Sequence, residues 1–330
     1  MKPSPYTTNH EGAPRRMGVE LEFSGLSLED ISNTVVSCFG GHVDIKGRYV
    51  SEIHTEQFAE AGSFSVELDA SLLKNGKMSG YLNRLSLGKK ELADKVEDLI
   101  ADSAMEFVPM EIVTPPLLIT DLPELEKLRE ALQRQSVEGT RSSVFNAFGL
   151  HLNPEVPSLD AGELRDFLRA FILMYDWLEE RHQVDSSRHI TPYIDAFPRK
   201  YARLIMQEDY APDISGLIDD YLLHNPTRNR PLDLLPLFTF IDEQKVSNAI
   251  NDGLTTKRPT FHYRLPNCDI SNPDWSFTQE WNHWVVVERI ASGKDKLYRL
   301  TASYLEYLEQ PGKRFVSHMK QQLNKWFKAE

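Results

Sequence analysis

The sequence predicts an α+β fold, with strands concentrated in the first half of the chain and helices in the second. The first half contains short runs in which apolar and polar residues alternate, as they do in antiparallel strands with one buried face. The second half contains longer runs in which apolar residues recur every three or four positions, as they do on one face of a helix. With 330 residues, of which 41% are hydrophobic, the chain is long enough to bury a large core.

The first half is expected to begin with a loose polar tail over residues 1–15, followed by a strand at 16–23. A helix is predicted at 31–39, directly before the pair of glycines at 40 and 41. Alternation then predicts antiparallel strands near 42–50 and 64–68. Apolar residues at helical spacing predict amphipathic helices at 89–104 and 122–134, on either side of a strand around Glu111.

The clearest helix of the second half is predicted to begin near Asp160, which forms a capping-box-like start with Glu163. Its apolar stripe continues to about His182. Residues 183–232 are rich in Arg, Asp, Pro and Tyr, and we expect them to form a loop-rich insertion. Further helices are expected at about 234–250, 296–309 and 312–328.

Two carboxylates lie at strand spacing in the segment R-M-G-V-E-L-E-F at 16–23. Because side chains alternate along a strand, Glu20 and Glu22 share one face, and Val19, Leu21 and Phe23 share the other. Like charges on one face repel each other, and a divalent cation bound by both carboxylates removes this repulsion. For an isolated E-x-E pattern, the alternative of a solvated acidic face on an edge strand is the more common arrangement.

Three later segments place further candidate ligands on strands. Glu111 is an acid inside an apolar strand, M-E-I-V-T-P-P at 110–116, where burial requires a partner or a metal ion. The segment G-L-H-L-N at 149–153 puts His151 and Asn153 on one strand face, although a lone histidine there is more often a core residue. In R-P-T-F-H-Y-R at 258–264, His262 and Arg264 share a face. Imidazole can bind a metal, and a guanidinium can bind phosphate through two hydrogen bonds.

Four of these motifs, taken in order, resemble those of the amidoligase family, ATP-dependent ligases related to glutamate–cysteine ligase and glutamine synthetase. They are G-V-E-L-E-F at 18–23, V-E-L-D-A-S-L at 66–72, E-I-V-T-P-P-L at 111–117 and G-L-H-L-N at 149–153. The resemblance covers the first half of the chain, and Arg264 with its flanks is the main match in the second half. Two positions depart from the family pattern. Asn153 stands where a second histidine is usual, and His262 stands where the superfamily has the glutamate of an E-x-R strand, which leaves the number of metal ions open.

The resemblance implies a glutamine-synthetase-like curved antiparallel sheet backed by helices. We expect a single catalytic domain over 16–330, with the 183–232 insertion at the site entrance. The resemblance also implies ATP and Mg²⁺ as cofactors, and a ligase that joins a small-molecule or peptide carboxylate to an amine through an acyl phosphate. The metal ligands that it implies are Glu20, Glu22, Asp69, Glu111, His151 and His262, with Glu67 as the alternative to Asp69. Glu111 and Arg264 are the catalytic candidates, and Arg264 is also the candidate for contact with the nucleotide phosphates. Arg230, in the insertion, is a further candidate for contact with the nucleotide on the basis of its charge.

Several alternatives stay open at this level. The superfamily fold is shared with kinases that phosphorylate guanidino groups, and a metal-dependent peptide-binding module without turnover would keep the same ligands. Arg228 and Arg230 are either site residues or surface charges in a proline-bounded loop. The tryptophans at 275, 281 and 284 either stack on a base or pack in the core. Cys268 has no visible base and is expected to be a small buried thiol.

Composition excludes some classes of partner. The formal charge of −12 and the pI near 5.4 argue against a nucleic-acid or anionic-membrane binder, which needs clustered basic charge. No window approaches the roughly 18 consecutive apolar residues of a membrane span, and the polar start lacks a signal-peptide core. Two cysteines are too few for a disulfide framework. We therefore expect a cytoplasmic protein, and the sequence does not define its oligomeric state.

Overall fold

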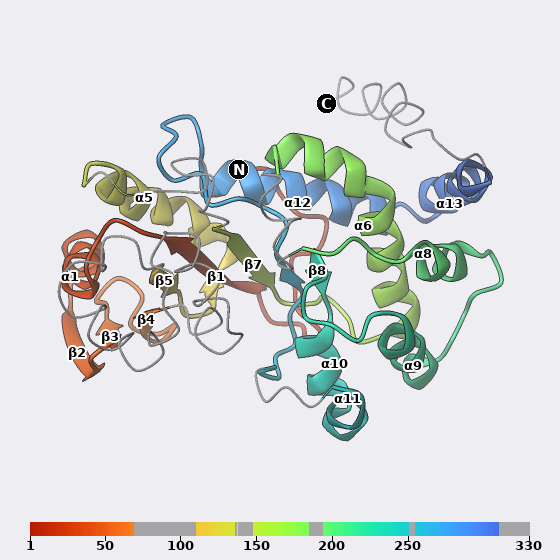
Figure 1. Cartoon of the computed structure of the whole chain (residues 1–330), viewed down its shortest axis with the longest axis horizontal. Coiled ribbons are helices and arrows are strands. Elements are labelled where there is room, and N and C mark those ends of the chain that lie inside the picture. The colour runs from red at the N-terminus through yellow and green to blue at the C-terminus, as the bar shows by residue number, and fades with distance from the viewer. Residues whose placement is uncertain (69–109, 136, 138–147, 185–193, 251–254, 310–330) are drawn as a thin grey trace, which may run out of the picture.

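The computed structural model describes residues 1–68, 110–135, 137, 148–184, 194–250 and 255–309, and a large antiparallel β-sheet lies at its centre (Figure 1). The strand order is β2-β3-β4-β5-β1-β7-β9-β8, and the short β6 pairs with the start of β1. The strands are β1 Arg16–Phe23, β2 His42–Gly47, β3 Val50–His54, β4 Phe64–Leu68, β5 Met110–Val113, β6 Leu117–Leu118, β7 Leu150–Pro154, β8 Leu232–Asp233 and β9 His262–Tyr263. With the helices described below, the sheet confirms the α+β class.

Strand β1 lies inside the sheet, between β5 and β7. Its apolar residues Val19, Leu21 and Phe23 are at most 2% exposed and belong to the core. Glu20 and Glu22 alternate with them and therefore point to the opposite face. Because β1 has a strand on each side, the two carboxylates are not on an edge strand, and the alternative of a solvated edge is wrong.

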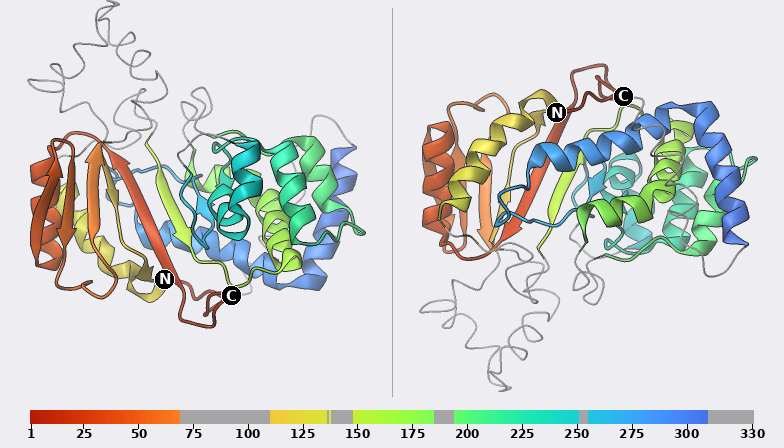
Figure 2. Two further views of the ribbon diagram at one scale, coloured as in Figure 1. Left: turned by 90° about the horizontal axis from the view of Figure 1, so that it is seen from below. Right: turned by 90° about the horizontal axis from the view of Figure 1, so that it is seen from above.

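Helices pack on the apolar face of the sheet. Figure 2 shows α5 (Glu126–Gln133), α12 (Phe277–Ser292) and α6 (Ala161–His182) across this face, and α1 (Leu28–Phe39) packs against β2, β3 and β4. The ring of Phe167 on α6 lies 4.7 Å from that of Phe261, between centroids. The ring of Trp284 on α12 lies 5.0 Å from that of Tyr263 on β9. These aromatic contacts fix β9 to the two longest helices described.

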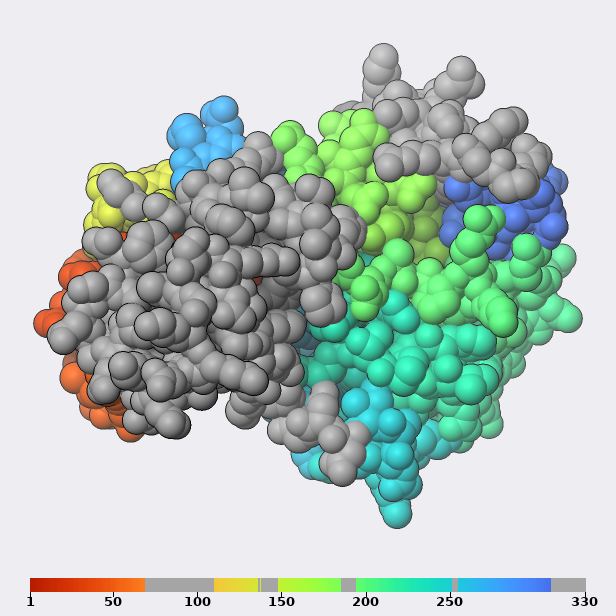
Figure 3. Space-filling view, in the orientation of Figure 1, coloured from red at the N-terminus to blue at the C-terminus, as the bar shows by residue number. Residues whose placement is uncertain are grey.

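A second group of helices lies at the β8 end of the sheet. It comprises α8 (Arg199–Met206), α9 (Ile214–His224), α10 (Leu235–Ile241), α11 (Glu243–Ala249) and α13 (Lys294–Leu308). The residues from α8 to α11 form the continuous green-to-teal surface in Figure 3. Residues 183–232 were expected to be loop-rich, whereas their described part contains α8 and α9. Pro198 and Pro212, which suggest loops, stand just before these helices, and the buried Tyr201 and Tyr221 anchor them.

The other predicted helices agree with the structure to different degrees. The helix predicted from Asp160 is α6, and the Asp160 carboxylate accepts a hydrogen bond of 3.0 Å from the Glu163 backbone N–H. The helix predicted at 122–134 begins as the 3₁₀ helix η2 (Ile119–Leu125), which contains Pro123, and continues as α5. The helix predicted at 234–250 is interrupted at Asp242, which caps α11.

The remaining outcomes concern the carboxyl-terminal half and the predicted amphipathic helices. Helix α12 was not predicted, because polar residues are interspersed among its apolar residues. Its sequence therefore shows no clear apolar stripe, although three of its aromatic side chains are buried. The helices expected at 89–104 and 312–328 lie outside the described residues. Trp275, Trp281 and Trp284 are at most 5% exposed and belong to the core, as does the thiol of Cys268. Among the described helices, none combines the length and the apolar character that crossing a membrane requires.

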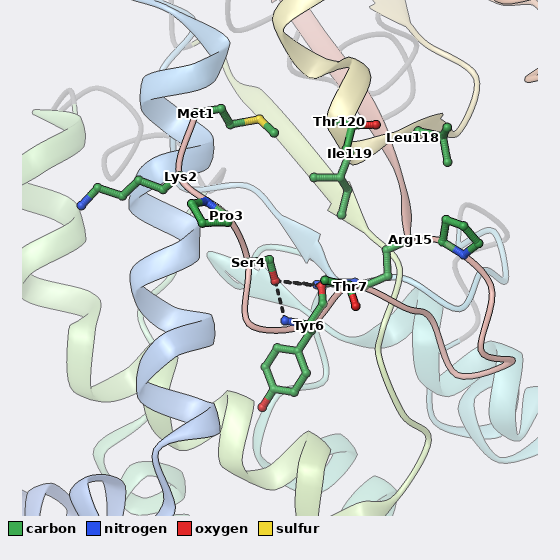
Figure 4. A pocket seen from close by; sticks show the side chains of 11 residues that line it. Met1, Lys2, Pro3, Ser4, Tyr6, Thr7, Arg15, Leu118, Ile119 and Thr120 are labelled. Carbon is green, nitrogen blue, oxygen red and sulfur yellow. Dashed lines mark hydrogen bonds between the residues drawn. The ribbon is translucent and has the colours of Figure 1, made fainter. Parts of the chain in front are cut away.

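The polar segment 1–15 is packed and not loose. The buried guanidinium of Arg15 forms an ion pair of 2.9 Å with Glu288 on α12, and Ser4 also donates to this carboxylate. The ring of Tyr6 lies 5.1 Å from that of Phe167. Figure 4 shows the apolar pocket that residues 1–7 form with residues 118–120 of β6 and η2. The segment is therefore part of the layer that holds α6 and α12.

Candidate functional site

The sheet register brings four of the predicted site residues together on the face opposite the helices. Glu20 on β1 lies opposite His151 on β7, and Glu22 on β1 lies opposite Glu111 on β5. Glu67 on β4 lies opposite Glu111 in turn. Three adjacent strands thus supply a row of carboxylates beside one imidazole.

Glu20 has several partners on this face. Its Oε2 accepts a hydrogen bond of 2.8 Å from Nδ1 of His151, and its Oε1 accepts one of 2.8 Å from Nδ2 of Asn153. Nη1 of Arg258 lies 3.2 Å from Oε1, and Nε2 of His262 lies 3.5 Å from Oε2. The side chain is only 11% exposed. Four side chains, from β7, β9 and the segment leading to β9, therefore meet at this carboxylate.

Burial and pairing have opposite effects on the two central groups. Burial raises the pKa of Glu20, but the charge of His262 and the hydrogen bond from His151 outweigh it and hold the pKa well below its usual range. Burial lowers the pKa of His151 to about 3, and the nearby charge of Arg264 acts in the same direction, although Glu20 opposes it. At neutral pH the pair is therefore a carboxylate and a neutral imidazole.

The neutral ring of His151 has a direct consequence for Glu22. Because Nδ1 carries the proton that is donated to Glu20, Nε2 presents its lone pair to Oε1 of Glu22, 3.5 Å away. Two electron-rich atoms therefore face each other. The other oxygen of Glu22 accepts a hydrogen bond of 2.7 Å from the backbone N–H of Gly149, which fixes the carboxylate in this position. A cation between Nε2 and Oε1 would turn this repulsion into attraction.

Two groups of side chains that include His151 have ligand atoms close enough to share one ion. Glu22, Glu111 and His151 form the first group, and Glu20, His151 and His262 form the second, each with ligand atoms within 4.8 Å of one another. The first group fits a divalent cation better, since its His151 donates Nδ1–H to a carboxylate, as metal-binding histidines do. Oδ1 of Asn153 is also buried without a hydrogen-bond partner among the described residues, so it offers a further oxygen donor.

The two predicted arginines have different environments. Arg264 follows β9 and is half-buried, its backbone N–H donates to the carbonyl of Pro231 at 2.9 Å, and its Nη1 donates to the carbonyl of Arg228. Its charge acts on His151, as described above. Arg230 is 8% exposed, and its guanidinium donates to the carbonyls of Asp195 and Ala196 at 3.1 and 2.8 Å. Arg230 thus binds neighbouring backbone, and its predicted contact with a nucleotide stays a prediction.

Asp69 lies outside the described residues, so its role as a ligand also stays a prediction. Glu67, the alternative, is half-buried beside Glu111. Two residues of the site were not predicted. Arg258 lies four positions before His262, in the same segment, and reaches Glu20. Asp233 on β8 pairs with His262, and its Oδ2 lies 3.7 Å from Nδ1 of that ring. The sequence signal for Asp233 is an acid inside the apolar run L-D-L-L.

A buried network of hydrogen bonds and ion pairs holds β9 in place on the helix face of the sheet. His182 at the end of α6 is hydrogen-bonded through Nε2 to the hydroxyl of Tyr263 and paired through Nδ1 with Glu280 of α12. Nδ1 of His283 lies 3.4 Å from the same oxygen of Glu280. Because side chains alternate along β9, anchoring Tyr263 toward the helices turns His262 toward the opposite face, where Glu20 lies.

The fold and the site together define a protein with an acidic, imidazole-containing face on an antiparallel sheet and arginines beside it, suited to a divalent cation and an anionic ligand. The chain belongs to the amidoligase family, because a family model described as "Putative amidoligase enzyme" matches residues 13–286. This match confirms the resemblance seen in the sequence motifs. Neither a curated protein nor a solved structure matches the chain.

Proposed function

We propose that the protein is an ATP-dependent carboxylate–amine ligase that forms an amide bond through an acyl phosphate and releases ADP and phosphate. Membership of the amidoligase family supports the ligase class. The observation that carries the proposal is the arrangement of Glu22 and His151, whose facing acceptor atoms, 3.5 Å apart, favour a cation. We also propose that the sheet is of the glutamine-synthetase type.

The proposed chemistry explains why a ligase would need such a face. A free carboxylate is a poor acyl donor, because its leaving group would be oxide. Transfer of the γ-phosphoryl group of ATP to a carboxylate oxygen releases ADP and gives a mixed anhydride. Attack of the amine nitrogen on the acyl carbon then forms the C–N bond, and the C–O bond to phosphate breaks with its electron pair leaving on phosphate. The ammonium proton must pass to a base.

The residues of the face have distinct proposed roles. Glu22, Glu111 and His151 would hold Mg²⁺, which when bound neutralises the charge of the phosphates. Glu20 orients His151 through the Nδ1–H hydrogen bond. Arg264 binds the transferred phosphoryl group through its planar guanidinium. Glu111 is the carboxylate that accepts the ammonium proton.

The proposed reaction defines its substrates only by chemical class. The acyl donor would be a small-molecule or peptide carboxylate and the acceptor a small amine or an amino acid, with selectivity in residues 183–232. The acidic composition is consistent with a cytoplasmic enzyme that uses neither nucleic acid nor membrane as a partner. The guanidino kinase and the peptide-binding module without turnover are the alternatives.

A screen for ADP formation with Mg²⁺ and ATP distinguishes these functions. Pairs of carboxylates and amines are tested, and the product is identified by mass. We expect ADP formation that depends on both substrates. ADP formation with a guanidino compound alone would identify a kinase. Binding of a peptide without any nucleotide turnover, in every pair tested, would favour the binding module.

A further inference from the structure

A second cluster of metal-binding side chains lies at the β2 end of the sheet, on the hairpin formed by β2 and β3. His42 on β2 pairs with His54 on β3, and Asp44 pairs with Glu52. Since side chains two residues apart share a strand face, all four lie on one face of the hairpin. The register places this cluster on the same face of the sheet as Glu22 and Glu111, but three strands, β3, β4 and β5, separate β2 from β1, so the two groups of side chains are distinct.

The geometry of this cluster is that of a chelating group. The rings of His42 and His54 lie nearly parallel, with 5.1 Å between their centroids and an angle of 24° between their planes. Oδ2 of Asp44 lies 3.7 Å from Nε2 of His54. Ligand atoms from all three residues lie within 4.8 Å of one another, and His42 and Asp44 are exposed.

The charges around the cluster indicate that it attracts a cation. Nζ of Lys46 lies 3.3 Å from Asp44 and 3.1 Å from Glu52. Ser63 donates a hydrogen bond to Glu52 and holds that carboxylate beside the lysine. The lysine ammonium therefore competes with a bound metal ion for Asp44.

We propose that His42, Asp44 and His54 form a binding site for a divalent transition-metal ion of the Zn²⁺ type. Two imidazole nitrogens and one carboxylate oxygen suit such ions better than they suit Mg²⁺, which prefers oxygen ligands. Water completes the coordination, since the cluster faces solvent. The ion joins β2 to β3 near their ends, next to the irregular register between Ile45 and Gly47, and stabilises this hairpin.

Calorimetric titration with ZnCl₂ tests the site, with the wild-type chain compared with the double variant His42→Ala/His54→Ala. We expect the double variant to bind one Zn²⁺ ion fewer. The variant Glu22→Gln is the control for zinc bound at the group around His151, and it should keep the hairpin site. Equal stoichiometry and affinity in the wild type and the double variant would overturn the proposal.

Variants of Lys46 and Asp44 provide a second, independent test in case the double variant does not fold. Lys46→Ala removes the competing ammonium and should tighten Zn²⁺ binding at the hairpin, whereas Asp44→Asn removes a ligand and should weaken it. A purely structural role of the cluster would make neither change affect zinc affinity. Unchanged affinity in both variants would likewise contradict the site.

Discussion

Nε2 of His151 on β7 faces Oε1 of Glu22 on β1 at 3.5 Å, while the other nitrogen of the same ring donates to Glu20 at 2.8 Å. The imidazole therefore interacts with the two carboxylates in different ways. Toward Glu20 the ring is a hydrogen-bond donor, which fixes its tautomer. Toward Glu22 it presents a lone pair, and the two groups together can bind a cation.

Replacing Glu22 with glutamine should weaken Mg²⁺–ATP binding by about tenfold or more, because even partners of metal ligands commonly contribute that much. Thermal stability should change little, since the side chain keeps its size and its acceptor oxygen for Gly149. Titration calorimetry and a melting curve measure the two effects. Glu60→Gln, at an exposed position, is the matched control and should leave the affinity unchanged. Wild-type affinity in Glu22→Gln would remove this carboxylate from the site.

The variant Glu20→Gln should differ from Glu22→Gln in stability. Glu20 is buried and accepts hydrogen bonds from His151, Asn153 and Arg258, and the amide can replace only part of these. We expect a loss of about 1–3 kcal/mol in the free energy of unfolding in addition to weaker Mg²⁺–ATP binding. Denaturant unfolding measures this loss. A variant as stable as the wild type would show that the carboxylate charge is not needed to hold the neighbouring side chains.

Arg264→Lys should lower turnover by about 10²-fold or more, because the positive charge stays but the planar guanidinium is lost. The effect should fall on turnover and less on the affinity for the amine. Arg230→Lys is the contrasting variant, since Arg230 donates to backbone carbonyls and should affect stability first. If Arg264→Lys kept near-normal turnover, Arg264 would be a structural residue.

Acid unfolding should depend on Glu280. Burial raises its pKa, but the charge and hydrogen bond of His182 outweigh it and lower the pKa from 4.5 to about 2. Between these values the unfolded chain binds a proton that the folded chain does not, so the stabilisation is full above about pH 5 and is lost as the pH falls toward 2. The shift corresponds to about 3 kcal/mol. Glu280→Gln should remove this part of the pH dependence, and the exposed Glu130→Gln should keep it. Parallel pH profiles for the wild type and Glu280→Gln would contradict this assignment.

The reaction path can be tested with labelled substrate once an active pair is known. Oxygen-18 in the substrate carboxylate should appear in the released phosphate, because the transferred phosphoryl group takes that oxygen with it. Cys268→Ala should keep most activity, since the thiol is fully buried and packed in the core. Label in AMP, or a covalent adduct on Cys268, would exclude the acyl phosphate route.

Local patterns predicted much of the first half and the longest helix. Alternation along 16–23 predicted the buried and the polar face of β1, and the Asp160 cap with its apolar stripe predicted α6. Local patterns failed where a helix has no clear apolar stripe, as in α12, and where prolines suggested loops, as in α8 and α9. In these helices tertiary packing, and not local periodicity, stabilises the helical conformation.

The sequence by itself determined the α+β class, the shared face of Glu20 and Glu22, and the family, because these depend on local alternation and on the order of short motifs. Only the tertiary structure decided which partners these residues have. Glu20 meets Arg258, 238 positions away in the sequence, and Asp233 meets His262 across two short strands. Such contacts depend on the strand register and on the hydrogen bond that holds Tyr263 against the helices. Neither of these produces a local sequence pattern.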